Sequence, residues 1–380
     1  MNIARLAVIC DLIEENWPSM DLVAEMLLGQ TPAQQTARVE GARICPPMRR
    51  RFTALPMVGQ QWAAHNADRL LNRFWDYPRM LRQRSREFDL FHLCDHSYAQ
   101  LLHALPGAQT GVFCHDLDTF RCLLEPEQEP RPRWFKKMAA YTLQGLQRAG
   151  VVFYTTATVR QQIERHGLLD PARLVQAPYG ISPEYRPEPQ PEDAAVDRLT
   201  GLHGEPFILH VGSCIPRKRI DVLLDVFAAL RAAHPELKLV QAGGEWTNAQ
   251  QGQLKRLGIA AATIQLPRQK RRTIAALYRR ATLVLLPSEA EGFGLPIIEA
   301  LACGSVTVAS DIPVFREVGG EATVYCPLAD VAAWAETAEQ LLTNTDLAFD
   351  REKRLAQARR YSWEEHGRIV FQAYRRLQTA

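Results

Sequence analysis

The sequence predicts an α/β protein made of two doubly wound domains, each built on a parallel sheet. Three observations lead to this prediction. Short apolar runs alternate with longer helical patterns along most of the chain. The length of 380 residues exceeds one ordinary hydrophobic core and suits two domains. A proline-rich stretch at 178–191 can continue neither a helix nor a central strand, so it predicts the linker.

The first half of the chain supplies the elements of the first domain, for which we expect residues 1–187. Apolar runs predict strands at 3–10, 88–93, 110–114, 151–154 and 173–177. Apolar residues at helical spacing predict helices at 21–28, 63–84 and 136–147.

The second half repeats this alternation and predicts a second domain over residues 188–360. Its apolar runs predict strands at 207–211, 237–242, 283–286 and 306–310. Its helical patterns lie at 220–234, 273–279, 296–303, 331–342 and 362–377. Doubly wound sheets bind ligands at the carboxyl ends of their strands, so we expect the site in a cleft between the domains.

Composition and cysteine usage indicate a soluble cytoplasmic protein. Hydrophobic residues make up 47% of the chain and charged residues 23%, as in globular proteins. No apolar run is long enough to span a membrane, and the start is predicted to be a buried strand, not a signal peptide. Eight scattered cysteines without a CxxC pair favour a reducing compartment and argue against a disulfide framework or structural metal.

Positive charge is concentrated in residues 43–86. This segment holds ten arginines against two acids, a net +8, whereas the whole chain carries +3. Such an excess attracts phosphates or anionic surfaces. From Trp62 to Trp75, apolar and basic residues interleave at helical spacing, which fits either a helix at an anionic membrane surface or an ordinary solvated helix. The aromatic residues do not form a stacking pattern, so we expect no nucleic-acid partner.

The most informative segment is 285–304. A predicted strand leads into a loop with Gly292 and Gly294, and a helix begins near the proline two residues further on. The glycines let backbone N–H groups approach a ligand, and the helix N-terminus favours a phosphate. Glu291 in the loop and Glu299 on the helix can accept hydrogen bonds from sugar hydroxyls. A dinucleotide fingerprint is excluded because its third glycine is missing, and a purely structural loop is the alternative.

This segment resembles the E-x7-E signature of the retaining glycosyltransferases of family 4, which have the GT-B fold of two facing Rossmann-like domains. Residues 211–219 resemble the glycine-then-lysine loop of that family, and 306–320 resemble its next strand and loop. Residues 361–364 resemble the opening of its terminal helix, which implies that 361–380 crosses back onto the first domain. The resemblance is close over 203–377, more distant over 88–187, and fades before residue 88.

The resemblance implies roles for the donor-side residues. Glu291 would contact hydroxyls of the donor sugar, and Glu299 would accept the ribose hydroxyls. Lys218 would neutralise the leaving diphosphate, so that Glu291 and Lys218 stabilise the transition state. The arginine that usually follows the loop glycine is Ser213 here, which makes Arg217 a substitute candidate. Backbone amides of the donor loop would hold the sugar and distal phosphate, at Gly292, Phe293, Gly294 and Leu295.

In the first half, His115 follows the predicted strand at 110–114 and resembles the histidine of the His-Asp-Leu motif of the family. The resemblance implies that His115 contacts the donor sugar as a third catalytic residue. The alternative is a histidine that makes only local hydrogen bonds. Asp116 and Asp118 match the D-x-D pattern of the other glycosyltransferase fold, but their place after His115 favours coincidence, so we expect no metal.

The loop after the first strand departs from the family pattern. Many members carry a glycine pair there, whereas this loop is acidic and bulky. We expect Asn16 and Trp17 on the acceptor side, with the Trp17 ring as a platform for a sugar.

These observations predict a metal-independent, retaining glycosyltransferase without a cofactor. It would move a sugar from a nucleotide-sugar donor to a glycan, a lipid-linked sugar or a small molecule, in the cytoplasm or at the inner face of the membrane. The enzyme alternatives are a sugar phosphorylase or a nucleotide-sugar epimerase on the same scaffold. A non-catalytic nucleotide-sugar-binding subunit is the alternative outside catalysis, and the intact set of Glu291, Glu299 and Lys218 argues against it.

Overall fold

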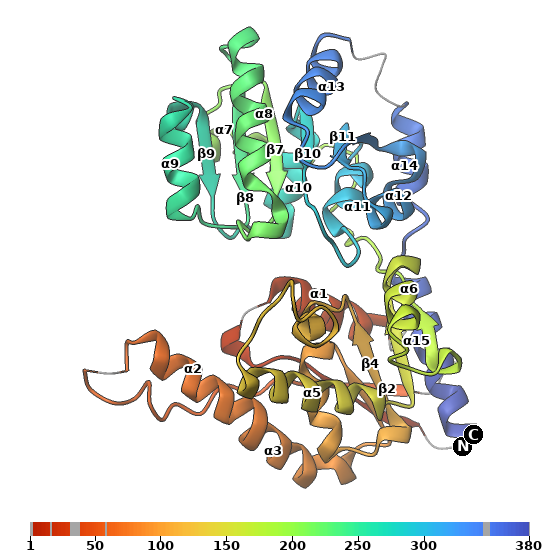
Figure 1. Cartoon of the computed structure of the whole chain (residues 1–380). Coiled ribbons are helices and arrows are strands. Elements are labelled where there is room, and N and C mark those ends of the chain that lie inside the picture. Colours follow the sequence, from red (N-terminus) through yellow and green to blue (C-terminus); the bar gives the residue numbers. More distant parts are fainter. Residues whose placement is uncertain (1–2, 16, 31–38, 58, 345–349, 380) are drawn as a thin grey trace. The chain divides into compact units, whose positions relative to one another are not determined.

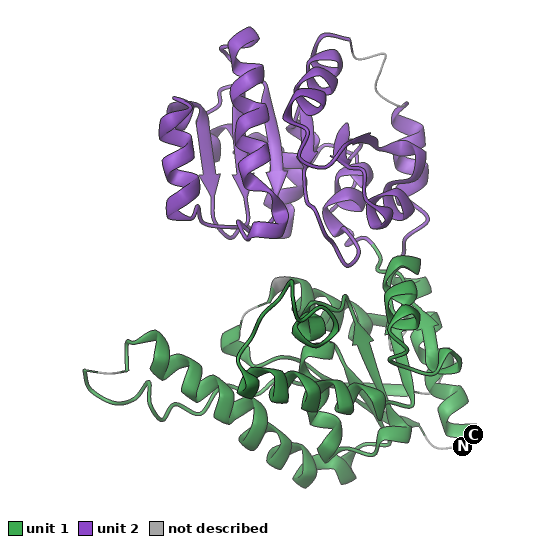
Figure 2. Cartoon of the chain, viewed as in Figure 1, with its two compact units in different colours: residues 1–180, 363–380 green, residues 181–362 purple. Residues whose placement is uncertain are grey.

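The computed structural model describes residues 3–15, 17–30, 39–57, 59–344 and 350–379. They form two compact units, shown in Figure 2: unit 1 comprises residues 1–180 and 363–380, and unit 2 comprises residues 181–362. Each unit contains one six-stranded sheet in which every described strand pair is parallel (Figure 1). The predicted α/β class with two parallel sheets is confirmed.

Unit 1 is built on strands that are mostly buried along their length, as expected for a parallel sheet covered by helices. The strands are β1 (Ala4–Ile9), β2 (Val39–Ile44), β3 (Leu90–Leu93), β4 (Thr110–Cys114), β5 (Val151–Tyr154) and β6 (Leu174–Gln176). The main helices are α1 (Pro18–Gln30), α2 (Trp62–Leu71), α3 (Tyr77–Arg84), α4 (Arg121–Leu124), α5 (Arg133–Gln147), α6 (Ala157–Arg165) and α15 (Trp363–Thr379), with a 3-10 helix η5 (His96–Ala104).

The sheet of unit 1 has the strand order β2-β1-β3-β4-β5-β6. The chain therefore leaves β1 toward one edge to form β2, and returns to the other side of β1 to form β3. The registers Ile9↔Ile44 and Ile9↔Leu93 bring the carboxyl ends of these three strands level.

The terminal helix α15 belongs to unit 1, although unit 2 precedes it in the sequence. Its buried face includes Trp363, His366, Val370 and Tyr374. The Tyr374 hydroxyl donates to the carbonyl of Phe91 at 2.9 Å, which fixes the helix to β3. The chain thus returns to unit 1 with α15.

Unit 2 contains strands β7 (Phe207–Val211), β8 (Lys238–Ala242), β9 (Thr263–Leu266), β10 (Leu283–Leu286), β11 (Thr307–Ser310) and β12 (Val324–Cys326). Its helices are α7 (Asp193–Thr200), α8 (Ile220–Ala233), α9 (Asn248–Arg256), α10 (Arg271–Arg280), α11 (Leu295–Ala302), α12 (Pro313–Gly319), α13 (Val331–Thr343) and α14 (Arg351–Ala358). The strand order is β12-β11-β10-β7-β8-β9, the order of a Rossmann domain.

Three strands were not predicted from the sequence: β2, β9 and β12. Each lies at an edge of its sheet and is only partly buried. An edge strand needs no continuous apolar run, so the signal that reveals central strands is weak there.

The predicted helix at 63–84 is interrupted by a π-helical turn η3 (Asn72–Asp76) between α2 and α3. Pro78 lies in the first turn of α3 and has no N–H for the carbonyl of the preceding turn, which accounts for the widened turn. Among the described residues, no helix has both the length and the apolar character needed to cross a bilayer.

Candidate active site

The candidate site in unit 2 lies at the topological switch point of the sheet. Strands β7 and β10 are neighbours, and the chain leaves them toward opposite edges. Ligands of open α/β sheets bind outside the carboxyl ends of two such strands. The loops that follow them, 212–219 and 287–294, contain most of the residues predicted to bind the donor.

The loop after β7 positions two cations. It passes Gly212 and the half-buried Ser213, and then forms a 3-10 turn, η9 (Pro216–Lys218). Arg219 follows with φ of 49° and caps the start of α8. The carbonyl of Arg217 accepts the backbone N–H of Glu289 at 2.9 Å, so this turn is bonded directly to the loop after β10.

Glu291 lies between these two cations. One carboxylate oxygen is 2.5 Å from Nζ of Lys218, and the other is 3.0 Å from a guanidinium nitrogen of Arg217. The same guanidinium nitrogen donates to the carbonyl of Ala290 at 2.8 Å. Burial alone would raise the pKa of Glu291, but the charges of Lys218 and Arg217 outweigh it and hold this pKa below its usual value. The three side chains keep one net positive charge at the switch point.

The glycine loop leads from Glu291 into α11. Gly294 has φ of 92°, and a Cβ atom there would lie 2.9 Å from the ring of Phe315, so only glycine fits without strain. Phe293 is buried and packs edge-on against Tyr361, with ring centroids 5.5 Å apart. The loop is thereby anchored, and the N-terminus of α11 follows at Leu295. Free N–H groups at such a helix end suit an anion.

Glu299 occupies a buried position on α11. The hydroxyl of Tyr278 donates to its carboxylate at 3.4 Å, and Tyr185 makes a further hydrogen bond with it. Burial raises the pKa of Glu299 to about 7, although these tyrosines and the positive charge of Arg271 oppose the shift. Near neutral pH this carboxyl group is therefore present in both protonation states.

Two groups of residues around the unit 2 site were missed from the sequence. Tyr185 and Tyr278 reach Glu299 from positions 114 and 21 residues away in the chain. His210, in the middle of β7, is fully buried, and its Nδ1 bonds with the carbonyl of Leu285 at 2.9 Å. A histidine inside an apolar strand was the sequence signal for this contact. No residue pattern near Tyr185 or Tyr278 in the sequence indicates that they contact Glu299.

His115 in unit 1 follows β4, as predicted, and both of its ring nitrogens have partners. Nε2 donates to the carbonyl of Cys94 at 2.6 Å, and the Tyr179 hydroxyl bonds with Nδ1. The backbone N–H of His115 donates to Nδ1 of His96 at 3.3 Å. Burial lowers the pKa of His115, so the ring is neutral at pH 7. No local pattern in the sequence indicated Tyr179 as a partner.

Asp95, His96 and His115 each have a potential metal-ligand atom within 4.8 Å of the others. A metal ion there would have to replace one of the two hydrogen bonds made by the ring nitrogens of His115. Asp116 takes part in a different contact, because its Oδ1 accepts the backbone N–H of Asp118 at 3.0 Å.

The acceptor-side predictions concern the loop after β1. Trp17 lies immediately before α1, and 56% of its surface is exposed. Asn16 lies outside the described residues.

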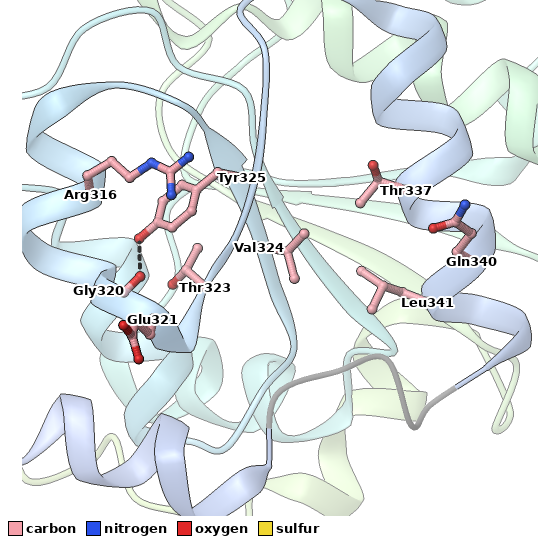
Figure 3. Close-up of a pocket in the computed structure, with 9 residues that line it drawn as sticks. All are labelled: Arg316, Gly320, Glu321, Thr323, Val324, Tyr325, Thr337, Gln340 and Leu341. Carbon is pink, nitrogen blue, oxygen red and sulfur yellow. Dashed lines mark hydrogen bonds between the residues drawn. The ribbon is translucent and has the colours of Figure 1, made fainter.

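A hollow elsewhere in unit 2 is shown in Figure 3. It lies between α12, β12 and α13, and none of the described residues predicted for the active site lines it. The guanidinium of Arg316 covers the Tyr325 ring at 4.1 Å, and the Tyr325 hydroxyl donates to the carbonyl of Gly320 at 2.9 Å. Arg316, Tyr325 and Gly320 are thus in contact with one another.

Comparisons with known proteins connect the unit 2 site to a family. Residues 196–361 match the family model of the glycosyl transferases group 1. O-antigen chain mannosyltransferase B of Escherichia coli is 28% identical over 309 residues, which cover 79% of this chain and 79% of that protein. D-inositol 3-phosphate glycosyltransferase of Rhodococcus erythropolis is 32% identical over 238 residues, which cover 60% of this chain and 53% of that protein.

A solved structure supports the fold of the whole chain. The Anabaena protein Alr3699/HepE, determined in complex with UDP and glucose, superposes with a TM-score of 0.73 at 14% identity. The alignment covers 97% of this chain and 98% of that protein. The matched family model contains the loops with Lys218 and Glu291, and the matched fold contains both sheets. The chain is therefore a glycosyltransferase with the GT-B fold, and its residues 196–361 match the model of the glycosyl transferases group 1.

Proposed function

We propose that this glycosyltransferase takes its sugar from a nucleotide-sugar donor bound at the β7–β10 switch point of unit 2, with retention of configuration and without a metal ion. The observation that carries the proposal is the convergence of Lys218 and Arg217 on the glycine loop before α11. A diphosphate leaving group develops negative charge, and two fixed cations with a helix N-terminus stabilise it where other enzymes use Mg²⁺. The Anabaena protein with the same fold was determined with UDP and glucose, which is consistent with this class of donor.

Glu291 and Glu299 suit different parts of such a donor. The carboxylate of Glu291, ionised by its cations, would accept hydroxyls of the donor sugar. Glu299, buried on α11, would accept ribose hydroxyls. In front-face transfer the leaving phosphate takes the proton of the acceptor, so no protein base is required. We therefore assign transition-state stabilisation to Glu291 and Lys218, as in retaining enzymes of family 4.

We propose a contact with the donor sugar for His115 as well. In the free protein its ring nitrogens bond to the carbonyl of Cys94 and the hydroxyl of Tyr179. A side-chain contact with the donor would require one of these bonds to open. The His115 carbonyl offers a contact that needs no such change, and the ring bonds would then keep this backbone in place.

The acceptor is proposed to be a glycan or a lipid-linked sugar, reached in the cytoplasm at an anionic membrane surface. Apolar side chains of the basic segment 43–86 stay exposed: Phe52, Leu55, Met57, Trp62, Leu71 and Trp75. Figure 1 shows α2 and the loop before it extending outward from the rest of unit 1. Exposed aromatic residues among arginines are the composition of interfacial membrane helices. The relative named as an O-antigen chain enzyme is consistent with a glycan acceptor.

Nucleotide release tests the proposed reaction. The full-length chain is incubated with a panel of UDP- and GDP-sugars, including glucosyl and mannosyl donors, and free nucleoside diphosphate is measured. Transfer or slow donor hydrolysis releases the diphosphate, whereas an epimerase leaves the donor bond intact and a phosphorylase acts on a sugar phosphate. Absence of release and of nucleotide binding across the panel would refute the proposal.

A further inference from the structure

The ring of His115 has a partner at each nitrogen, and together the two partners fix its tautomer. Nε2 lies 2.6 Å from the carbonyl oxygen of Cys94, which can only accept a hydrogen bond, so Nε2 carries a proton. Burial lowers the pKa of His115, and the neutral ring therefore holds no second proton. Nδ1 is thus an acceptor, and the hydroxyl of Tyr179 donates to it.

Tyr179 is suited to be the donor of this pair. Its exposed fraction is 4%, and burial raises the pKa of its hydroxyl well above the usual range, so the hydroxyl keeps its proton near neutral pH. If the ring of His115 turned over, it would lose the bond to Tyr179 as well as the bond to the carbonyl of Cys94. The two bonds therefore hold the ring in one orientation as well as in one tautomer.

Tyr179 belongs to a cluster of aromatic rings in unit 1. The ring of Phe113, on β4, is stacked with His115 and with Tyr179, and the centroids are 5.1 Å apart in both pairs. The rings of Trp363 and His366, on α15, have centroids 5.6 Å and 5.8 Å from that of Tyr179. Trp363, His366 and Phe113 are buried. These contacts hold the Tyr179 ring in place beside His115.

Helix α15 also holds the backbone next to Tyr179. Nδ1 of His366 donates to the carbonyl of Pro178, the preceding residue, at 3.0 Å. Burial lowers the pKa of His366 to about 4, so this ring is neutral at pH 7 and has only one N–H. Nε2 of His366 is buried and has no hydrogen-bond partner among the residues that the structure describes. The one N–H of His366 is therefore directed at the backbone beside Tyr179.

A second Tyr–His pair in unit 1 shows what is particular to this one. The hydroxyl of Tyr374 bonds with Nδ1 of His92 at 2.9 Å, and both side chains are fully buried. His92 lies inside β3, whereas His115 follows the carboxyl end of β4 and is partly exposed. Ligands of parallel sheets bind at the carboxyl ends of the strands. The pair with Tyr179 can therefore influence a bound ligand, whereas the pair with Tyr374 lies in the core.

We propose that Tyr179 is a positioning residue for sugar transfer: it holds His115 in one tautomer and one orientation, and His366 on α15 holds Tyr179. The role in transfer rests on the proposed function, which gives His115 its contact with the donor sugar. Tyr179 acts through His115 in this proposal and does not touch the donor. Its loss should therefore affect handling of the sugar and leave nucleotide binding by unit 2 unchanged.

Nitrogen-15 NMR of the histidine side chains tests the pair without any ligand. The His115 signals are assigned by their disappearance in His115→Gln. In the wild type we expect a protonated Nε2 and an unprotonated, hydrogen-bonded Nδ1. Tyr179→Phe should shift the Nδ1 resonance downfield, because this nitrogen loses its donor, while Nε2 stays protonated. A protonated Nδ1 in the wild type, or an Nδ1 resonance that does not move in Tyr179→Phe, would overturn the proposal.

Turnover and nucleotide binding separate positioning of the sugar from binding of the nucleotide. With the panel of UDP- and GDP-sugars, Tyr179→Phe should lower turnover by about tenfold, since a small displacement of a substrate contact is costly. Thermal shifts with UDP and GDP should equal those of the wild type. His366→Leu should also lower turnover. His366→Asn should restore it at least in part, because its amide N–H can donate to the carbonyl of Pro178.

Tyr374→Phe is the matched control, because it removes the same hydroxyl from the Tyr374–His92 pair. Its melting temperature should fall through the loss of a buried bond, but its turnover should equal that of the wild type. Wild-type turnover in a folded Tyr179→Phe, or an equal loss in Tyr374→Phe, would overturn the proposal. A wild-type chain that releases no nucleotide from the panel would contradict the proposed function, and the NMR result would still decide whether Tyr179 fixes the His115 ring.

Discussion

Nζ of Lys218 lies 2.5 Å from the carboxylate of Glu291, although the two residues are 73 positions apart in the sequence. They meet because β7 and β10 are neighbours at the switch point and each residue follows one of these strands. In the free protein each charge therefore holds the other in place. A donor that binds Lys218 through its phosphates would find the cation already oriented, which lowers the cost of ordering it.

Because Lys218 and Glu291 act as a pair, the effects of their substitutions on turnover should not be additive. We expect Lys218→Ala and Glu291→Gln each to lower turnover by about 10²-fold, the scale of one transition-state electrostatic contact. The double variant should be close to the worse single variant, because each single change already disrupts the pair. Nucleotide release under saturating donor gives the measurement.

Lys238→Ala is the control for this comparison of the single and double variants. Lys238 begins β8, at the opposite end of the strands from the site, and pairs with Glu205 at 3.5 Å. It should retain wild-type turnover. If the losses of turnover in the two single variants add up fully in the double variant, Lys218 and Glu291 do not act as a pair. Near-normal turnover in both single variants would contradict their catalytic role.

Glu299 should make stability depend on pH. Its pKa in the native protein is about 7, above the ordinary value of 4.5, so the native state binds the proton more tightly than the unfolded state. This contribution is fully present below pH 4.5 and is lost as the pH rises through 7. The loss amounts to about 2–3 kcal/mol between pH 5 and pH 8.

Glu299→Gln stays uncharged and should lack this loss. Relative to the wild type, the variant should therefore gain stability from pH 5 to pH 8, measured by thermal and urea unfolding at both values. Glu236→Gln serves as control, because that side chain is 56% exposed. An identical pH dependence in wild type and Glu299→Gln would show that the native pKa is not raised.

The sequence predicted the glycine loop and the start of the following helix in unit 2 because their signals are local. The glycine at 294 and the helix start at α11 are readable from neighbouring residues, and the observed φ of 92° explains the glycine. The order of the strands in the sheet cannot be read from neighbouring residues in the sequence. It brings Lys218 to Glu291, and nothing in either loop alone indicates a 2.5 Å ion pair.

Contacts made by aromatic hydroxyls were not predictable for the same reason. Tyr278 comes from α10 and Tyr179 from the segment after β6, and each lies in what the sequence presents as an apolar or linker pattern. Asp11 shows a different limit. A single acid after a strand looks like any solvated loop residue, and only burial reveals that it has no partner among the described residues.

Chelation should leave activity intact if fixed cations replace a metal. We expect nucleotide release in excess EDTA to stay within a few-fold of the untreated rate, because Lys218 and Arg217 supply the positive charge at the diphosphate. Addition of Mg²⁺ or Mn²⁺ to chelated enzyme is the reciprocal measurement. A loss of activity that either ion restores would refute metal independence and direct attention to Asp116 and Asp118.

Membrane attachment through segment 43–86 should depend on both its aromatic and its basic residues. The loop before α2 is held by Asp68, whose carboxylate accepts the backbone N–H groups of Arg51, Phe52 and Thr53. Arg51 is further bonded to Asp76 at 2.7 Å. These bonds order the loop while Met57 and Trp62 remain 96% and 82% exposed.

Liposome co-sedimentation measures this attachment. We expect the chain to pellet with anionic vesicles at low salt, to stay in solution with neutral vesicles, and to be released as salt is added, because each basic residue near the surface contributes about 1 kcal/mol. Arg49 and Arg50 are exposed, and their side chains add only a 3.8 Å pair with Asp76 and a 3.3 Å bond to the carbonyl of Thr53. Because the bonds to Asp68 come from backbone N–H groups, Arg49→Ser with Arg50→Ser should weaken membrane binding while those bonds remain. Trp62→Ser should weaken it further. Trp134→Ser, which removes a 58% exposed tryptophan on α5, is the matched control and should bind normally.

A chain that remains in the supernatant with anionic vesicles at low salt would exclude the membrane role, and the arginines would then be explained by a soluble anionic acceptor or by an ordinary solvated surface.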